Sequence, residues 1–232
     1  MKKWILLIVL IAILAVGGVF AYIKTRPAKS STTTSTNTTQ SQSTPATTPT
    51  PTTSTIQSQY AMPVVNFLTG QTKKPFGIYI TPATSPVQPE RFTGYHTGVD
   101  IEQVQDNTDV PVYAINDGTV KFVGKVSGYG GVLIYGTTIN NQSVTILYGH
   151  IRLYSGGNSA AEGLSSAIKS VGDSVSKGEK LAVLGTGYSS ETDGERKHLH
   201  FSIHKGSQIV YLGYVQAQSQ LSDWINPDDI LK

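Results

Sequence analysis

The chain has 232 residues and no cysteine, and its 18 Lys and Arg against 15 Asp and Glu give a formal net charge of +3. Five of the basic residues precede Ser30, and the remaining 13 face 15 acidic residues, which leaves a net charge of −2. No basic surface for nucleic acid is therefore expected. The missing cysteine excludes disulfides, thiolate catalysis, cysteine-bound zinc and a lipoprotein anchor.

Residues 4–23 form an uncharged, almost entirely apolar run with basic residues on both sides. The run is long enough to cross the roughly 30 Å hydrocarbon core of a bilayer as a helix. Residues 1–29 are therefore predicted to be an N-terminal transmembrane anchor, or a cleaved signal peptide, since Val19-Phe20-Ala21 resembles a cleavage site. The length of the run favours the anchor. With either leader the rest of the chain is expected outside the cytoplasm, although the flanking charges alone do not determine the orientation.

Residues 30–59 are predicted to be a disordered linker. Of the 26 residues from Ser30 to Thr55, 19 are Ser or Thr, three are proline and none is charged. Such a composition cannot bury enough apolar surface to offset the entropy of ordering. The linker would span about 28 Å as a random coil and about 80 Å as polyproline II, so it can hold a domain at a variable distance from a bilayer.

Residues 60–232 are predicted to form the folded domain, because short β-type runs broken by Gly, Asp and Asn begin near Tyr60. Asn116-Asp117-Gly118 is a hairpin signal between the first two runs, and a polar turn at 140–142 joins the next two. The expected strands cover residues 111–115, 119–123, 131–135, 144–148, 180–184 and 198–204. This pattern predicts a mainly β domain, built as a compact antiparallel sheet or barrel-like sandwich.

Helix is scarce in this part of the chain. The best candidate covers residues 160–170, where Ser159 and Glu162 form a capping-box pattern before a run with one apolar face. A second, very short helical turn is expected near Asn226-Pro227, with Asn as the cap.

Four of the five histidines lie in compact phrases near predicted strands: His96, His150, His198 and His200, with Asp100 close to the first. Imidazole nitrogen and carboxylate oxygen are common zinc ligands, and a catalytic zinc site has three protein ligands and an open position. Each histidine alone is more often an ordinary polar residue. Together they supply enough groups for a zinc site and for acid and base catalysis.

Local geometry limits how these residues can meet. His198 and His200 project from the same face of a strand, with Cα atoms about 6.7 Å apart. His96 and Asp100 would be about 13 Å apart in an extended chain, so we expect a bend, which Gly98 permits. His204 continues the face of His200 but lies about 13 Å beyond it, so it is interpreted as structural or solvent-facing.

The order of the motifs resembles the M23 family of zinc metallopeptidases, of the LytM and lysostaphin type, over about residues 95–205. The motifs that carry the resemblance are His96-x-Gly98-x-Asp100, Asp117-Gly118-x-Val120 with a following Tyr129-Gly130, Tyr148-Gly149-His150, Val171-Gly172-Asp173-x-Val175-x-Lys177-Gly178-Glu179, and His198-Leu199-His200-Phe201. His-x-His alone would be weak evidence, but the complete ordered series is specific.

The resemblance implies that His96, Asp100 and His200 bind one Zn²⁺ per chain, and that His150 and His198 flank the metal-bound water. It also implies a compact antiparallel β domain of LytM type with a substrate groove between loops. Three segments depart from the family pattern and are expected to form groove walls, so specificity is not carried over. They are residues 154–170, 189–197 and 208–227.

The expected function is that of a membrane-anchored zinc endopeptidase in the cell envelope, which cleaves peptidoglycan stem peptides or cross-links on the extracytoplasmic side. It would be secreted if the leader is cleaved, and the need for an activating protein partner is left open. One alternative is a non-catalytic domain that binds peptidoglycan or activates another cell-wall hydrolase. Another is a structural envelope component whose anchor and stalk are the important parts.

The chain has no His-Glu-x-x-His motif and hence no glutamate base of that kind. His150 or His198 must then serve as the general base or stabilise the oxyanion, and the sequence does not distinguish these tasks. Tyr95 either donates a hydrogen bond to the oxyanion or packs at the groove rim, and the second is favoured. Asp193, Glu195 and Arg196 either contact substrate or keep a loop soluble, and the second is again favoured.

Overall fold

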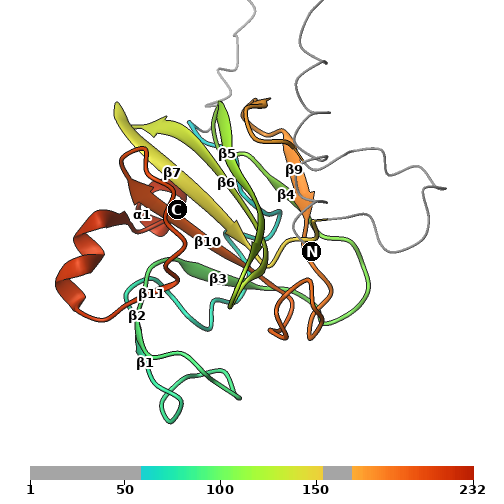
Figure 1. The fold of residues 1–232 in the computed structure, drawn as a ribbon, viewed down its shortest axis with the longest axis vertical. Coiled ribbons are helices and arrows are strands. Elements are labelled where there is room, and N and C mark those ends of the chain that lie inside the picture. Colours follow the sequence, from blue (N-terminus) through green and yellow to red (C-terminus); the bar gives the residue numbers. More distant parts are fainter. Residues whose placement is uncertain (1–58, 154–168) are drawn as a thin grey trace, which may run out of the picture. The chain divides into compact units, whose positions relative to one another are not determined.

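The computed structural model describes residues 59–153 and 169–232, which belong to one folded unit (Figure 1). The predicted anchor at 1–29, the linker up to residue 58 and most of the helix predicted at 160–170 lie outside the described residues. Within the described ranges, no helix is long and apolar enough to cross a membrane. The domain itself is mainly β with antiparallel strand pairs, as predicted.

The largest sheet has seven strands, with the spatial order β12-β10-β7-β6-β5-β8 and with β3 paired to β10 off this path. These strands are β3 (Val99–Glu102), β5 (Gly118–Val126), β6 (Gly130–Ile139), β7 (Gln142–Gly149), β8 (Ser174–Val175), β10 (His198–Lys205) and β12 (Trp224–Ile225). The long strands β5, β6, β7 and β10 lie side by side in Figure 1. They form the frame on which the site is built.

Two smaller sheets and two short helical segments complete the described part. One sheet has the order β1 (Tyr79–Ile80), β2 (Gly94–His96), β11 (Tyr214–Val215), and the other pairs β4 (Pro111–Tyr113) with β9 (Lys180–Val183). The helical segments are a 3₁₀ helix, η1 (Gln218–Asp223), and α1 (Asp228–Leu231). The Asp228 N–H donates to Asn226 Oδ1 at 3.2 Å, so Asn226 caps the short C-terminal helix as expected.

The hairpin predicted between residues 111–115 and 119–123 is wrong. β4 pairs with β9, whereas β5 pairs with β6 and β8. The turn residues bond outside the presumed hairpin: Asn116 Nδ2 donates to Thr138 O at 2.9 Å, and Asp117 Oδ1 accepts from the Lys177 N–H at 2.7 Å. The turn therefore joins two sheets instead of closing one hairpin.

The hairpin between β6 and β7 confirms the other turn prediction. Asn140 and Asn141 have φ angles of 49° and 62°, and Ile139 pairs with Gln142 across the turn. Positive φ at both central residues is the condition for the two-residue turn that matches the twist of antiparallel strands, and asparagine adopts it readily. The turn fixes the register of both strands, and β7 ends directly before His150.

The large sheet is packed on both faces. Along β6, Leu133 and Tyr135 join the main apolar core, while Val132 and Ile134 join a smaller cluster with Tyr129. Successive side chains of a strand point to opposite faces, so burial on both faces explains why β6 reads as an uninterrupted apolar run. The central strands are thus fixed from two sides.

Candidate metal centre

The register of β10 brings three separated parts of the chain together. His200 pairs with Asp100 of β3 on one side and with Gly149 of β7 on the other. The side chain of His198 projects from the same face as that of His200, as expected for residues two apart in a strand. The pairing of three strands therefore places Asp100, His150 and both histidines of His-Leu-His around one point.

His96 reaches the same point through a crossing between sheets. β2 ends at His96 in the small sheet, and β3 begins at Val99 in the large one. Gly98 lies in the crossing, where an added Cβ would be 2.5 Å from the backbone oxygen of Phe201 on β10. The bend expected here is present, and glycine is needed because β10 passes so close.

Three buried donor atoms lie within reach of a single ion. His96 Nε2 is 3.0 Å from His200 Nδ1 and 3.3 Å from Asp100 Oδ1, and His200 Nδ1 is 3.1 Å from Asp100 Oδ1. Tetrahedral bonds of 2.0–2.2 Å to zinc separate the ligand atoms by about 3.3–3.5 Å. The triad of His96, Asp100 and His200 therefore fits a zinc ion with small adjustments. Among the described residues, these three side chains are close enough together to hold one metal ion.

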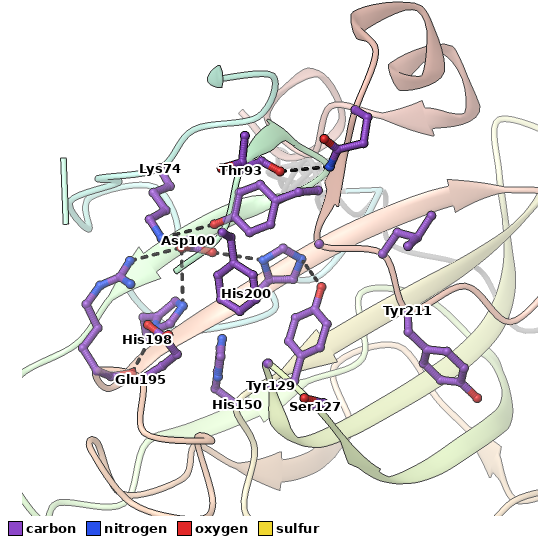
Figure 2. Close-up of a pocket in the computed structure, with 17 residues that line it drawn as sticks. Lys74, Thr93, Asp100, Ser127, Tyr129, His150, Glu195, His198, His200 and Tyr211 are labelled. Carbon is purple, nitrogen blue, oxygen red and sulfur yellow. Dashed lines mark hydrogen bonds and ion pairs between the residues drawn. The ribbon is translucent and has the colours of Figure 1, made fainter. Parts of the chain in front are cut away.

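Each of the three side chains also has a partner for the polar atom that faces away from the triad. These partners are Pro75 O for His96 Nδ1 at 3.3 Å, Arg196 Nη2 for Asp100 Oδ2 at 3.1 Å, and Tyr129 Oη for His200 Nε2 at 3.2 Å. Figure 2 shows His200 between Asp100 and Tyr129. Outer partners of this kind orient metal ligands and determine their tautomers. The arrangement assigns the donors as His96 Nε2, Asp100 Oδ1 and His200 Nδ1.

The protonation states suit a metal site. Burial alone would raise the pKa of Asp100, but electrostatic interaction with the adjacent imidazoles of His198 and His96 and hydrogen bonds from His200 and His96 hold it well below its usual range. Burial lowers the pKa of His200, against the opposing effect of Asp100. An ionised carboxylate and a neutral imidazole are the forms that bind a metal ion.

His150 and His198 lie beside the triad with their ring centroids 4.2 Å apart. His198 Nδ1–H donates to the carbonyl oxygen of Arg196 at 2.9 Å, which leaves Nε2 as the unprotonated nitrogen of the neutral ring. His150 has a φ of 60°, a conformation that is uncommon outside glycine and often marks functional positions. Burial lowers the pKa of His150 to about 3 and lowers that of His198 well below its usual value, so both rings are neutral at neutral pH.

A pocket of roughly 260 Å³ opens beside these residues (Figure 2). Asp100, His150, His198 and His200 line it together with four stretches of loop and strand. These stretches are Phe92–Thr93, Ser127–Tyr129, Glu195–Arg196 and Tyr211–Tyr214. The segments 189–197 and 208–227 thus contribute groove walls, as expected, whereas most of 154–170 lies outside the described residues.

Three pocket residues were not anticipated as functional from the sequence. Tyr129 belongs to the Tyr-Gly phrase of the motif series, but no partner for its hydroxyl could be predicted from the sequence. Tyr214 lies opposite His96 in the β2–β11 pair, with its ring centroid 5.2 Å from that of His96. Buried Lys74 donates to Tyr214 Oη at 3.2 Å and forms an ion pair with Glu90. No local sequence signal marks Lys74, because its partners are far away along the chain.

Arg196 is not a solubilising loop residue, and that interpretation was wrong. Its residue surface is 4% exposed, and its guanidinium contacts both Asp100 and Glu102. Glu102 lies two residues after Asp100 and Arg196 two before His198, so the strand period of two could have indicated their common face. In the same loop, Glu195 and Asp193 form ion pairs with Arg91.

The two remaining candidates lie away from the pocket. Tyr95 does not line it, and its ring lies against exposed Tyr79 with a centroid separation of 4.8 Å. The favoured interpretation of Tyr95 as a packing residue thus fits better than an oxyanion role. His204 packs edge-on against Trp224, which agrees with a structural role.

Comparison with known proteins identifies the family. The model of Peptidase family M23 matches residues 94–212, which is half of the chain and includes the triad and both groove histidines. The chain belongs to peptidase family M23. No curated protein matches it significantly.

Three solved structures are similar to this M23 chain at low sequence identity. LytU is 22% identical over 69% of this chain and 83% of its own, with a TM-score of 0.43. A chain of the SpoIIIAH and SpoIIQ complex is 22% identical over 74% of this chain and 99% of its own, with a TM-score of 0.44. Csd3 of Helicobacter pylori is 21% identical over 75% of this chain, which spans 34% of the Csd3 chain, with a TM-score of 0.43.

Proposed function

We propose that the domain is a zinc-dependent endopeptidase that hydrolyses peptide bonds in peptidoglycan stem peptides or cross-links. The observation that carries the proposal is the buried His96, Asp100 and His200 triad beside two neutral histidines in an open pocket. A triad of two imidazoles and one carboxylate is a ligand set of catalytic zinc sites. Membership of the peptidase family supports the reaction class.

The residues of the chain divide the chemistry between them. His96 Nε2, Asp100 Oδ1 and His200 Nδ1 would hold the ion, which when bound polarises a carbonyl group and lowers the pKa of a coordinated water. His198 Nε2 is the unprotonated nitrogen of the ring and can accept a proton, because the Nδ1–H is donated to the Arg196 carbonyl. The neutral ring of His150 retains one N–H that can donate to the oxyanion of the tetrahedral intermediate.

The purified protein should contain about one zinc ion per chain and release new amino groups from purified cell walls. His96→Ala should lose both the metal and the release. His150→Ala and His198→Ala should lose the release and keep the metal, because neither is a proposed ligand. A metal-free protein that releases nothing would overturn the proposal, and wall binding without release would favour the non-catalytic alternative.

We further propose that residues 1–29 anchor the protein in the membrane and that the linker at 30–59 extends the domain at 60–232 to the wall on the extracytoplasmic side. The apolar run at 4–23 and the position of the substrate outside the membrane support this arrangement. Externally added protease should release the domain from intact spheroplasts by cutting in the linker. A domain protected from protease until the cells are lysed would contradict it.

A further inference from the structure

We propose that Arg196 is a positioning residue that makes Asp100 a one-oxygen ligand and thereby keeps the fourth position of the metal centre open. The inference rests on the proposed metal site and adds to it a residue from the loop that distinguishes this chain from the family pattern. It concerns the geometry of the centre and not the identity of its ligands.

The two carboxylate oxygens of Asp100 have different surroundings. Oδ1 faces the triad, 3.3 Å from His96 Nε2 and 3.1 Å from His200 Nδ1. Oδ2 faces away from it, 3.1 Å from Arg196 Nη2 and 3.4 Å from His198 Nε2. The oxygen that a metal ion would need for two-point binding is thus already engaged by a cation.

Glu102 in turn holds the guanidinium of Arg196 in a fixed orientation. Its Nε donates to both oxygens of Glu102, each at 2.9 Å, and its Nη2 donates to Glu102 Oε1 at 2.6 Å. The same Nη2 also donates to Asp100 Oδ2. A planar guanidinium can span two carboxylates in this way, whereas the ammonium of a lysine is a single point of charge.

The side chains of this ion-pair group are buried. The side chains of Arg196, Asp100 and Glu102 are 5%, 3% and 12% exposed. A charge-assisted hydrogen bond between buried groups is stronger than one on the surface, so burial favours Arg196 over water as the partner of Asp100 Oδ2. Asp100 and Glu102 lie on β3, and Arg196 lies two residues before His198, which pairs with Glu102, so the restraint is built at the end of this strand pair.

The consequence concerns coordination number. A carboxylate can bind a cation through one or both oxygens, and a catalytic zinc site needs one position that no protein atom fills. With Oδ2 bound to Arg196, Asp100 offers Oδ1 alone. Without Arg196, Oδ2 is free to turn towards the ion and bind it as an additional ligand, which would crowd the open position and raise the coordination number above four.

The experiment uses the full-length protein loaded with Co²⁺, whose visible absorption is intense in four-coordinate sites and weak at higher coordination numbers. The wild-type protein should give the intense spectrum, and Arg196→Met should lose much of that intensity. Zinc affinity, measured by competition with a chelator, should also fall by about 10–100-fold, as for other outer partners of metal ligands. Arg91→Met is the matched control, because Arg91 forms ion pairs with Asp193 and Glu195 outside the triad, and its spectrum should match the wild type.

Two further variants keep the test decisive if Arg196→Met does not fold. Arg196→Lys retains the charge without the planar guanidinium that spans two carboxylates. Glu102→Gln retains Arg196 but weakens the hydrogen bonds that orient it. Both should lose absorption intensity in the same direction, with Arg196→Lys the more affected. Spectra identical to wild type in all folded variants would overturn the role of Arg196 and leave the metal site intact. A wild-type protein that binds neither cobalt nor zinc would overturn both proposals.

Discussion

The two sheets that meet at the candidate metal centre differ in how strongly strand pairing restrains the residues of that centre. Asp100 and His200 lie in the seven-stranded sheet, where β10 is eight residues long and has paired strands on both sides. His96 ends β2, which is three residues long and pairs only with the two-residue strands β1 and β11 in its sheet. Two of the three proposed ligands are therefore placed by the folding of the main core.

His96 depends on fewer and more peripheral interactions. Its backbone N–H donates to Ile78 O at 2.9 Å, and the following Thr97 bonds through its N–H to Gly213 O and through its hydroxyl to Leu212 O. The two partners of Thr97, Leu212 and Gly213, line the pocket. A bound ion would therefore do more than supply chemistry, because it would join the small sheet to the more extensively paired large one.

Metal removal should therefore act on one sheet and hardly on the other. In the zinc-loaded protein, the amides around His96 and Gly77 should be protected from hydrogen exchange. If free zinc is initially 1,000 times its dissociation constant, removing it with a chelator should reduce that protection by up to about 1,000-fold. Amides of β10 should change little. Mass spectrometry of exchanged peptides measures both regions in one experiment, and equal changes in both would refute the contrast.

Gly98→Ala should damage the junction between the sheets. The new Cβ would meet the backbone oxygen of Phe201 at 2.5 Å, and backbone on β10 cannot move aside as a side chain could. We expect about 1–3 kcal/mol of lost stability and weaker zinc binding, because His96 is displaced from Asp100. Denaturant unfolding and chelator competition measure the two effects.

Gly136→Ala is the matched control for that substitution. Its Cβ would approach Lys121 Cε at 2.9 Å, which is the far end of a flexible side chain. It should cost much less stability and leave zinc affinity unchanged. Similar losses in the two variants would mean that Gly98 has no special place at the junction.

The contrast between the sheets also bears on what the sequence could predict. The β6–β7 hairpin was predictable because its asparagine turn is a local signal, and the grouping of the histidines and Asp100 followed from motif order. The pairing of β4 with β9 was not predictable, because strands some 70 residues apart along the chain produce no local sequence signal for their pairing. Arg196 was misjudged for a related reason. A charged residue in a polar loop resembles a solvated one until the register of β3 and β10 places it against Asp100 and Glu102.

Acid should weaken the metal-free protein through its buried histidines, of which His150 directly follows β7 of the large sheet. Burial lowers the pKa of His150 to about 3, whereas an unfolded histidine titrates near 6.5. The unfolded state therefore binds the extra proton first, so stability is complete above about pH 6.5 and falls as the pH decreases towards 3. His150 alone predicts a loss of about 2 kcal/mol between pH 7 and pH 5.

Denaturant unfolding at the two pH values measures this loss. His150→Asn is the suitable variant, because asparagine tolerates the positive φ of this position better than most residues. The variant should lose less stability than wild type over the same interval. An equal loss in both proteins would assign the acid sensitivity to other groups.

The smallest effect is expected where the large sheet already holds a ligand well. Tyr129→Phe removes the hydroxyl next to His200 Nε2 and leaves that buried nitrogen without its partner. Because β10 still fixes the backbone of His200 from both sides, the ring should lose orientation but remain near the ion. We expect about a tenfold loss of zinc affinity, the low end for outer partners, measured by chelator competition. Tyr211→Phe, at a tyrosine that is 37% exposed on the pocket wall, should leave the affinity unchanged. A loss much greater than 100-fold for Tyr129→Phe would mean that the strand does not hold His200 by itself, and the supposed rigidity of the large sheet at the metal centre would be wrong.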